Sequence, residues 1–258
     1  MAWPQEILAA AEDKDFKLAG CGLFAQVLVL IESGIALKIC DEPGEASEVE
    51  KKKIYERLGR HPQILTSYGK CESKAGKGLT LEYLPAGLVV RHLAQEKYLE
   101  ERKEWPAQAI NAVTYVHSKG VIHGDIGAHN FLVSKDGSVV LADFCGSSLD
   151  GSTAAVAPSI RYSRPISMEE RLLNIRVRDD LFALGAVLYE IAVGSRIWES
   201  KDDRNVTKLY ETGELPDLQG IEARLARVIK KCWKDQYESA DEIQANYAQL
   251  DDGLNVEE

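Results

Sequence analysis

The sequence changes character at Pro85-Ala86-Gly87, and this break divides the chain into a β-rich part and a mainly helical part. Before the break, runs of β-branched and aliphatic residues predict strands at 27–31, 35–40, 64–71 and 78–84, with one helix at 45–60. After it, apolar residues at helical spacing predict helices at 88–97, 101–118, 180–193 and 223–234, and a hairpin at 131–134 and 138–142. We therefore expect an α+β, two-lobed protein, with a small β-rich lobe at about 16–84 and a larger, mainly helical lobe at about 85–258.

The length and composition agree with a single globular domain over residues 1–258. The chain is 45% hydrophobic and 28% charged, which is ordinary for a folded protein that buries one large core. A short amphipathic helix is expected within residues 1–15, ahead of the β-rich lobe. The oligomeric state does not follow from these features.

Charge and cysteine content limit the partners and the compartment. A formal net charge of −10 argues against a nucleic-acid partner, and the longest apolar stretch, Leu181–Gly194, contains Glu190 and is too short to span a bilayer. The five cysteines are odd in number, dispersed and without a C-x-x-C pair, which favours a reducing compartment. The N-terminus lacks a signal peptide pattern, so we expect a soluble cytoplasmic protein, with access to the nucleus left open.

Two polar side chains flank the predicted hairpin. Asn130 precedes its first strand and Asp143 follows its second, so antiparallel pairing brings the two together. An amide oxygen and a carboxylate at one place suit a hard cation such as Mg²⁺. Asp125, five residues before Asn130, can reach the same cleft.

The β-rich lobe contributes a second set of candidates. In the run from Gly20 to Val27, Gly20 and Gly22 allow backbone N–H groups to approach phosphate oxygens. Lys38 ends the run Ile35-Ala36-Leu37-Lys38, and a lysine among apolar strand residues requires a partner. A glutamate of the helix at 45–60 is the expected partner. Glu50 is preferred and Glu48 is the alternative.

These motifs, taken in order, resemble the protein-kinase superfamily. The run from His123 to Asn130, followed by Asp143-Phe144, is similar to H-R-D-x-x-x-x-N and D-F-G. The run Gly20–Val27 resembles the glycine-rich loop, with Ala25 in place of the third glycine, and Ile35–Lys38 resembles V-A-I-K. Asp180–Gly185 and Lys231-Cys232-Trp233 resemble segments of the helical lobe, so the likeness covers nearly the whole chain.

The resemblance implies a role for each matched residue. Asp125 would accept the proton of the acceptor hydroxyl, Asn130 and Asp143 would hold Mg²⁺, and Lys38, held by Glu50, would bind ATP phosphates. Asp180 would bond the backbone of the catalytic loop. The residues implied to contact ATP are Leu18, Gly20, Gly22, Val27, Ala36, Lys38, Glu50, Glu82, Leu84, Leu132 and Asp143.

The catalytic loop departs from the kinase pattern at several positions. Gly124 replaces the arginine of H-R-D, which removes one means of sensing a phosphorylated activation loop. Gly127 stands where serine/threonine kinases carry a lysine, and His129 stands where tyrosine kinases carry an arginine, so slow turnover is expected. Cys145 replaces the glycine of D-F-G. Arg164-Pro165-Ile166 replaces A-P-E, which predicts that the usual ion pair of that glutamate is lost at both ends.

The predicted function is therefore an ATP- and Mg²⁺-dependent phosphotransferase. A protein kinase acting on Ser/Thr hydroxyls, in preference to Tyr, is favoured, with ATP and a protein substrate as partners. Two alternatives remain. The H-G-D loop also resembles small-molecule kinases such as the aminoglycoside and choline phosphotransferases, and the KEOPS-complex kinase. A nucleotide-binding pseudokinase that acts as a scaffold is the second alternative.

Overall fold

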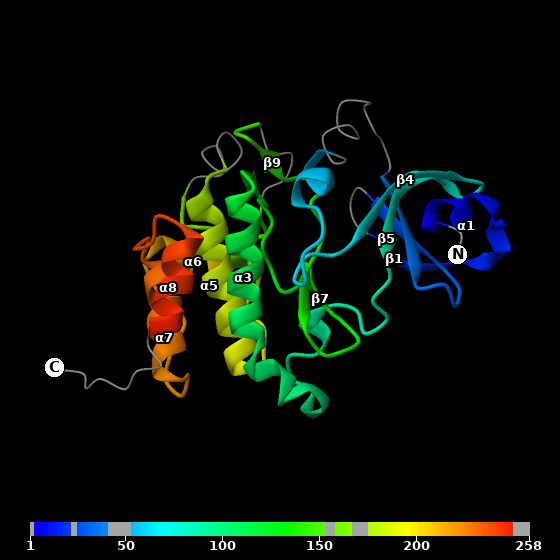
Figure 1. Ribbon diagram of the computed structural model, residues 1–258. Helices are drawn as coiled ribbons and strands as arrows, with labels where there is room; N and C mark the ends of the chain where they lie inside the picture. Colours follow the sequence, from blue (N-terminus) through cyan, green and yellow to red (C-terminus); the bar gives the residue numbers. More distant parts are fainter. Residues whose placement is uncertain (1–2, 22–24, 41–52, 153–157, 167–174, 250–258) are drawn as a thin grey trace.

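The computed structural model describes residues 3–21, 25–40, 53–152, 158–166 and 175–249, which form two lobes (Figure 1). The smaller lobe is built on a five-stranded antiparallel sheet with the strand order β1-β2-β3-β5-β4. Its strands are β1 (Phe16–Cys21), β2 (Ala25–Leu30), β3 (Ile35–Cys40), β4 (Ser67–Ser73) and β5 (Gly76–Glu82). The larger lobe contains α3 (Trp105–Ser118), α5 (Val177–Val193), α6 (Asp203–Glu211), α7 (Ala223–Trp233) and α8 (Ala240–Gln249). The predicted α+β, two-lobed fold is confirmed.

The register of the five-stranded sheet separates its side chains into two faces. Val27 pairs with Lys38 and Leu28 with Leu37, and successive residues of a strand point to opposite faces. Leu37 is fully buried in a cluster with Leu8 of α1 (Pro4–Ala10), so α1 covers one face (Figure 1). Lys38 consequently lies on the other face, which meets the helical lobe. The helix expected within residues 1–15 is confirmed.

Strand β1 lies where a glycine-containing loop was expected. Its pairing with β2 shifts between Leu18 and Gly20, as at a β-bulge. Exposed residues fill the middle of the strand, so the alternating pattern that would reveal it in the sequence is absent. Gly20 is therefore part of a strand, whereas Gly22 lies outside the described residues.

The core of the helical lobe is centred on α5. This helix packs against α3 and α7, and α3 also packs against α8. Residues 179–188 of α5 are buried on every side, as in a helix enclosed by others. The Asp179 carboxylate accepts the Arg176 N–H (2.7 Å) at its start, and Gly194, with φ +76°, ends it. The prediction of a helix at 180–193 is confirmed.

Two short helices were not predicted. Helix α6 buries only Val206 and Tyr210, and α8 buries only Ala240 and Ile243. Both are short and mostly polar, and neither contains a long apolar run. The start of α6 does have a local cause, because the Asp202 carboxylate accepts the Asn205 N–H at 2.8 Å.

The predicted helix at 88–97 is wrong. The segment forms two 3₁₀ turns, Val89–Arg91 and Glu96–Tyr98. Its backbone hydrogen-bonds to another segment of the chain, because Leu88 pairs with Leu132 and the Val90 N–H donates to the Ala128 carbonyl (3.2 Å). These bonds replace those that an α-helix would require.

The strand expected at 64–71 begins later, at Ser67. Ile64 instead forms a bridge with Leu141 of β8 (Val139–Leu141), and the Leu65 N–H donates to the Leu141 carbonyl (2.9 Å). This segment thus joins the two lobes rather than extending β4. Of the helix expected at 45–60, residues 53–58 are helical, and Gly59 ends them with φ +60°. The earlier residues lie outside the described chain.

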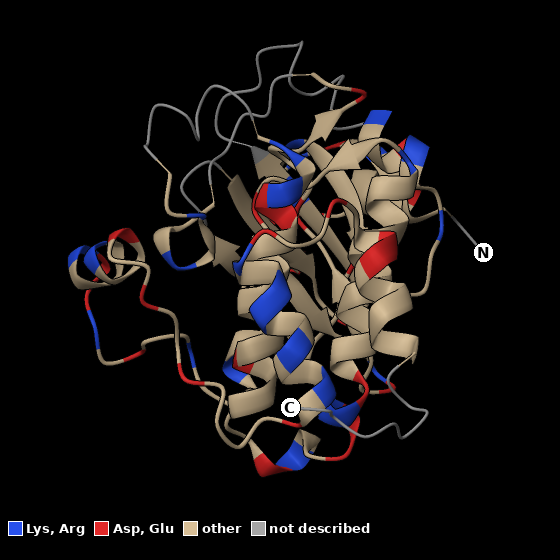
Figure 2. Ribbon diagram, turned by 90° about the vertical axis from the view of Figure 1, so that its left-hand side faces the viewer, with Lys and Arg blue, Asp and Glu red and all other residues tan. Residues whose placement is uncertain are grey.

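Figure 2 shows the side of the helical lobe formed by α6, α7 and α8, where Lys and Arg lie in a row along one helix. Helix α7 contains four such residues and no acidic one. Two of the four pack on neighbouring rings. Arg224 lies over Tyr247 (4.5 Å to the ring centre), and Lys231 lies over Tyr237 (4.3 Å). None of the described helices combines the length and apolarity needed to cross a membrane.

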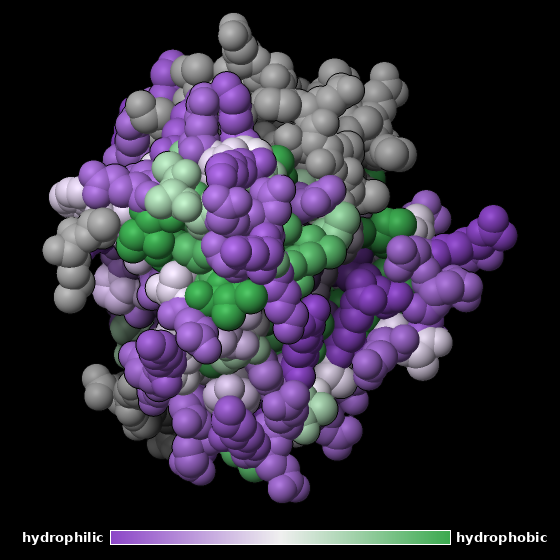
Figure 3. All heavy atoms as spheres, turned by 90° about the vertical axis from the view of Figure 1, so that its right-hand side faces the viewer, coloured by the Kyte–Doolittle hydropathy of each residue, from purple (hydrophilic) through white to green (hydrophobic). Residues whose placement is uncertain are grey.

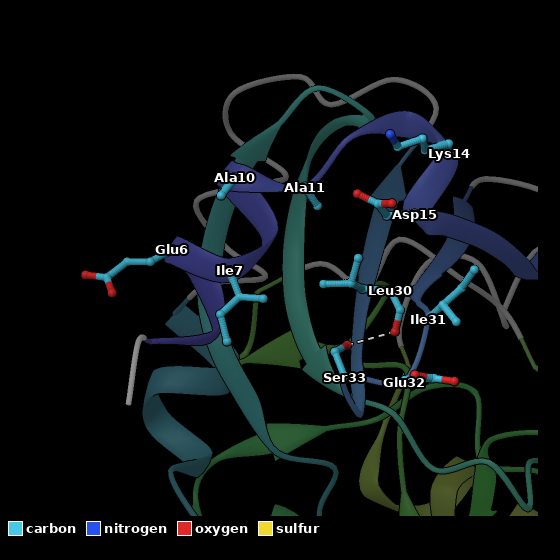
Figure 4. Close-up of a pocket in the computed structure, with 10 residues that line it drawn as sticks. All are labelled: Glu6, Ile7, Ala10, Ala11, Lys14, Asp15, Leu30, Ile31, Glu32 and Ser33. Carbon is cyan, nitrogen blue, oxygen red and sulfur yellow. Dashed lines mark hydrogen bonds between the residues drawn. The ribbon is translucent and has the colours of Figure 1, made fainter.

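The outer side of the β-rich lobe exposes apolar side chains (Figure 3). Trp3, Ile7 and Ile31 are 69%, 37% and 54% exposed. Ile7 and Ile31 line an open hollow of about 740 Å³ between α1 and the turn that joins β2 to β3 (Figure 4). Its lining includes no predicted site residue, so the hollow is separate from the site that those residues would form.

Candidate active site

The hairpin of β7 (Phe131–Val133) and β8 (Val139–Leu141) sets the geometry of the site. Phe131 pairs with Leu141, and the Ala142 N–H donates to the Asn130 carbonyl at 2.8 Å. Asn130 and Asp143 therefore lie at the same end of the hairpin, as the sequence predicted.

Asp125 is fixed by Asn130. The Asn130 Nδ2 donates to the Asp125 backbone carbonyl (2.7 Å) and to its carboxylate Oδ2 (2.9 Å). The Asp125 side chain is 29% exposed, and its Oδ1 has no hydrogen-bond partner among the described residues. One carboxylate oxygen is thus anchored while the other is left without a protein partner among the described residues.

A buried carboxylate holds the loop before Asp125. Asp180, at the start of α5 and 1% exposed, accepts the His123 N–H at 2.8 Å and the Gly124 N–H at 2.9 Å. It also accepts a hydrogen bond from the His117 ring at 2.9 Å. Gly124 has φ +79°, a conformation that favours glycine. The bond predicted between Asp180 and the loop backbone is confirmed.

The Lys38 side chain extends from β3 of the β-rich lobe to this site. Its Nζ lies 2.5 Å from Asp143 Oδ1, and the lysine is 8% exposed. The predicted partner Glu50 lies outside the described residues, so the partner that the structure shows is Asp143. The cause is geometric: Lys38 points from the inner face of the sheet to the end of the hairpin, where Asp143 adopts φ +63°.

The Lys38–Asp143 ion pair shifts the pKa values of both side chains. Burial raises the pKa of the Asp143 carboxyl, but the Lys38 ammonium outweighs it, and the net pKa lies below the ordinary value of 3.8. Burial lowers the pKa of Lys38, but Asp143 and the Cys145 thiol outweigh it, and the net pKa lies above 10.5. Both groups are therefore charged at neutral pH.

A cluster of aromatic rings connects this site to the helix at 53–58. The Phe144 ring contacts His123 at 4.9 Å and Tyr55 at 5.4 Å, both edge to face. Burial raises the pKa of Tyr55 well above its ordinary value of 10.0. Tyr55 was missed from the sequence, where only its helical position was readable.

The remaining predicted ATP residues divide between the two faces of the sheet. Val27 and Ala36 lie on the same face as Lys38 by strand register. Leu18 pairs with Leu28 on the opposite face and is 57% exposed, so it is left out of the site proposed below.

The segment between the lobes carries the other predicted contacts. Glu82 ends β5, and Leu84 follows in the connection. The Leu84 N–H makes no hydrogen bond among the described residues and is free to donate to a base. Leu132 of β7 is half-buried and forms its bridge with Leu88.

The segment Arg164-Pro165-Ile166 has its own ion pairs. Arg164 Nε binds Asp179 Oδ1 at 2.7 Å, and its Nη1 lies 3.7 Å from Asp235 Oδ2. Asp235 also binds Arg178, at 3.0 Å. The sequence predicted only the loss of the usual glutamate–arginine pair, and the structure shows a different set of ion pairs at this segment. Arg164 provides the positive charge that anchors the segment, and Asp179 and Asp235 of the helical lobe provide the carboxylates.

The two-lobed fold and the arrangement of the loop before β7 are those of a kinase domain. The protein kinase domain model matches residues 14–247, so the chain belongs to the protein kinase family.

Curated relatives agree with this assignment. The chain is 31% identical over 205 residues to Aurora kinase B of Mus musculus, which covers 70% of this chain and 56% of that protein. It is 29% identical over 194 residues to CBL-interacting protein kinase 31 of Oryza sativa subsp. japonica (69% and 41%). It is 25% identical over 234 residues to CBL-interacting serine/threonine-protein kinase 12 of Arabidopsis thaliana (83% and 47%). The chain spans about half the length of these relatives.

Proposed function

We propose that this protein transfers the γ-phosphoryl group of ATP to Ser or Thr hydroxyls of a protein substrate. The observation that carries the proposal is the meeting of Asp125, Asn130, Asp143 and Lys38 at one end of the β7–β8 hairpin. The likeness to a curated serine/threonine-protein kinase supports the same acceptor class.

Each residue has a distinct task in the proposed reaction. Asp125 orients the acceptor hydroxyl through its free Oδ1 and accepts the proton as the oxygen attacks the γ-phosphorus. Lys38 binds phosphate oxygens of ATP, exchanging part of its contact with Asp143 for them. Asp180 keeps the loop backbone in place, so that the base does not drift from the line of attack.

The residues present suit Mg²⁺. Asn130 donates both observed bonds through Nδ2, which leaves its amide oxygen available, and Asp143 supplies a carboxylate. Oxygen ligands of this kind, few in number, fit a cation that takes its remaining ligands from phosphate and water. Bound between Asn130 and Asp143, Mg²⁺ would supply neutralisation of phosphate charge. The described residues hold no cluster of three or more His, Cys, Asp or Glu side chains placed for a metal.

The test is transfer of radiolabel from the γ-phosphate of ATP, with Mg²⁺, to a mixture of protein acceptors and to the chain itself. Acid hydrolysis of the labelled protein should release phosphoserine and phosphothreonine. Label found only in a small hydroxyl compound would replace the proposal with a small-molecule kinase. ATP binding without any transfer would replace it with a pseudokinase.

A further inference from the structure

The catalytic loop from Asp125 to Asn130 contains no lysine or arginine, and its one basic side chain is His129. The His129 Nε2 lies 3.5 Å from Asp125 Oδ2, the same oxygen that accepts the Asn130 amide. The separation is at the long limit of a hydrogen bond, and such bonds commonly tighten when substrate fills a site. The imidazole thus contacts the oxygen that Asn130 already anchors.

The glycine at 127 makes room for this imidazole. A Cβ built on Gly127 would overlap the His129 Cε1 and lie 2.6 Å from its Nδ1. Gly127 does not have the positive φ that would itself favour glycine. The His129 ring therefore fills the space that a side chain at 127 would need.

The opposite side of the imidazole is formed by Tyr162. The two ring centres are 5.4 Å apart, inclined at 56°. Tyr162 is itself fixed, because its hydroxyl donates to Glu190 Oε2 at 2.8 Å. Tyr162 and Glu190 are 1% and 0% exposed.

Glu190 completes the support from α5. Its second oxygen, Oε1, accepts the Ile197 N–H at 2.9 Å, so both carboxylate oxygens are bonded. Buried hydrogen bonds thus fix Tyr162 to α5, and the Tyr162 ring in turn contacts the His129 ring. Such support restricts the positions that the imidazole can adopt.

We propose that His129 is a positioning residue for Asp125, and that Gly127 and Tyr162 form the slot that orients it. The imidazole donates from Nε2 to Asp125 Oδ2 beside the Asn130 amide. Two donors on one oxygen fix the plane of the carboxylate and present Oδ1 to the acceptor hydroxyl. This role rests on the proposed function, because it concerns the orientation of the proposed base.

The test compares His129→Ala, Gly127→Ala and the double variant with the wild type. Each single change should lower kcat about tenfold, the effect of losing one hydrogen bond to a charged group, with the KM for ATP unchanged. The double variant should be no slower than His129→Ala, because the same contact is already lost. His129→Gln, which keeps a donor near the Nε2 position, should recover part of kcat.

His61→Ala is the matched control, since His61 stacks on Tyr115, away from the catalytic loop, and its removal should leave kcat unchanged. Full activity in Gly127→Ala, or losses that add in the double variant, would overturn the proposal.

A second measurement does not depend on transfer. The ¹⁵N shifts of the His129 ring at fixed pH should change in Asp125→Asn and in Gly127→Ala. Unchanged shifts in Asp125→Asn would overturn the contact, even in an inactive protein. Changed ¹⁵N shifts in a protein that transfers no phosphate would support the His129–Asp125 contact and refute the proposed function.

Discussion

Asp180 is the side chain whose loss should damage the catalytic loop most. Its two oxygens accept three hydrogen bonds, from the His123 and Gly124 backbone and from the His117 ring. Asp180→Ala leaves these donors in a buried site, where each unsatisfied group costs about 1–3 kcal/mol. Allowing for partial relaxation, we expect a loss of about 3–6 kcal/mol, a large part of the roughly 5–15 kcal/mol that stabilises a domain. The melting temperature should fall by about 6–24 °C.

The assay is urea unfolding and calorimetry of Asp180→Ala against the wild type. Asp241→Ala is the matched control, because Asp241 is an exposed aspartate in the first turn of α8, and its loss should cost no more than about 0.5 kcal/mol. If Asp180→Ala loses less than about 1 kcal/mol, the three bonds do not hold the loop as described.

Three further perturbations test the electrostatics. In Lys38→Met, burial should raise the pKa of Asp143 above 3.8, and carboxyl ¹³C NMR measures this pKa. In the wild type, the ion pair should stabilise the fold at neutral pH, and this stabilisation should decline as pH falls through the lowered Asp143 pKa. Arg57→Ala breaks an exposed bidentate pair with Asp150, so it should lose much less stability than Asp180→Ala, and the loss should disappear in high salt. A loss in high salt as large as the loss in low salt would contradict this. Burial raises the pKa of Glu190 above 4.5, so the folded state holds its proton more tightly than the unfolded chain and loses stability as pH rises through that pKa. The difference in stability between Glu190→Gln and the wild type should therefore shift in favour of the variant as pH rises above 4.5, measured by chemical denaturation, and a difference that is constant with pH would contradict this.

The parts of the fold that the sequence predicts are those with strong local causes. The Asp-Gly turn and its flanking apolar runs specify the β7–β8 hairpin, and the hairpin alone brings Asn130 to Asp143. Helix α5 follows from a continuous apolar run that ends at Gly194. In both cases neighbouring residues carry the information.

The parts that it does not predict depend on contacts between distant segments. The segment at 88–97 has helical periodicity, yet its backbone bonds Ala128 and Leu132 of the catalytic region. Tyr162 and Glu190 are 28 residues apart, and no local pattern relates them to His129. Their role is visible only once the slot beside Gly127 is seen in three dimensions.

The most direct test of the central claim is the rate of label transfer from ATP by the wild type and by Asp125→Asn, at equal ATP occupancy. Asp125→Asn preserves the shape of the side chain and removes its ability to accept a proton. Loss of a positioned general base typically costs about 10²–10⁴-fold, so the variant should transfer label at least about a hundredfold more slowly. Equal rates would show that Asp125 is not the base, and the account of this site would fail.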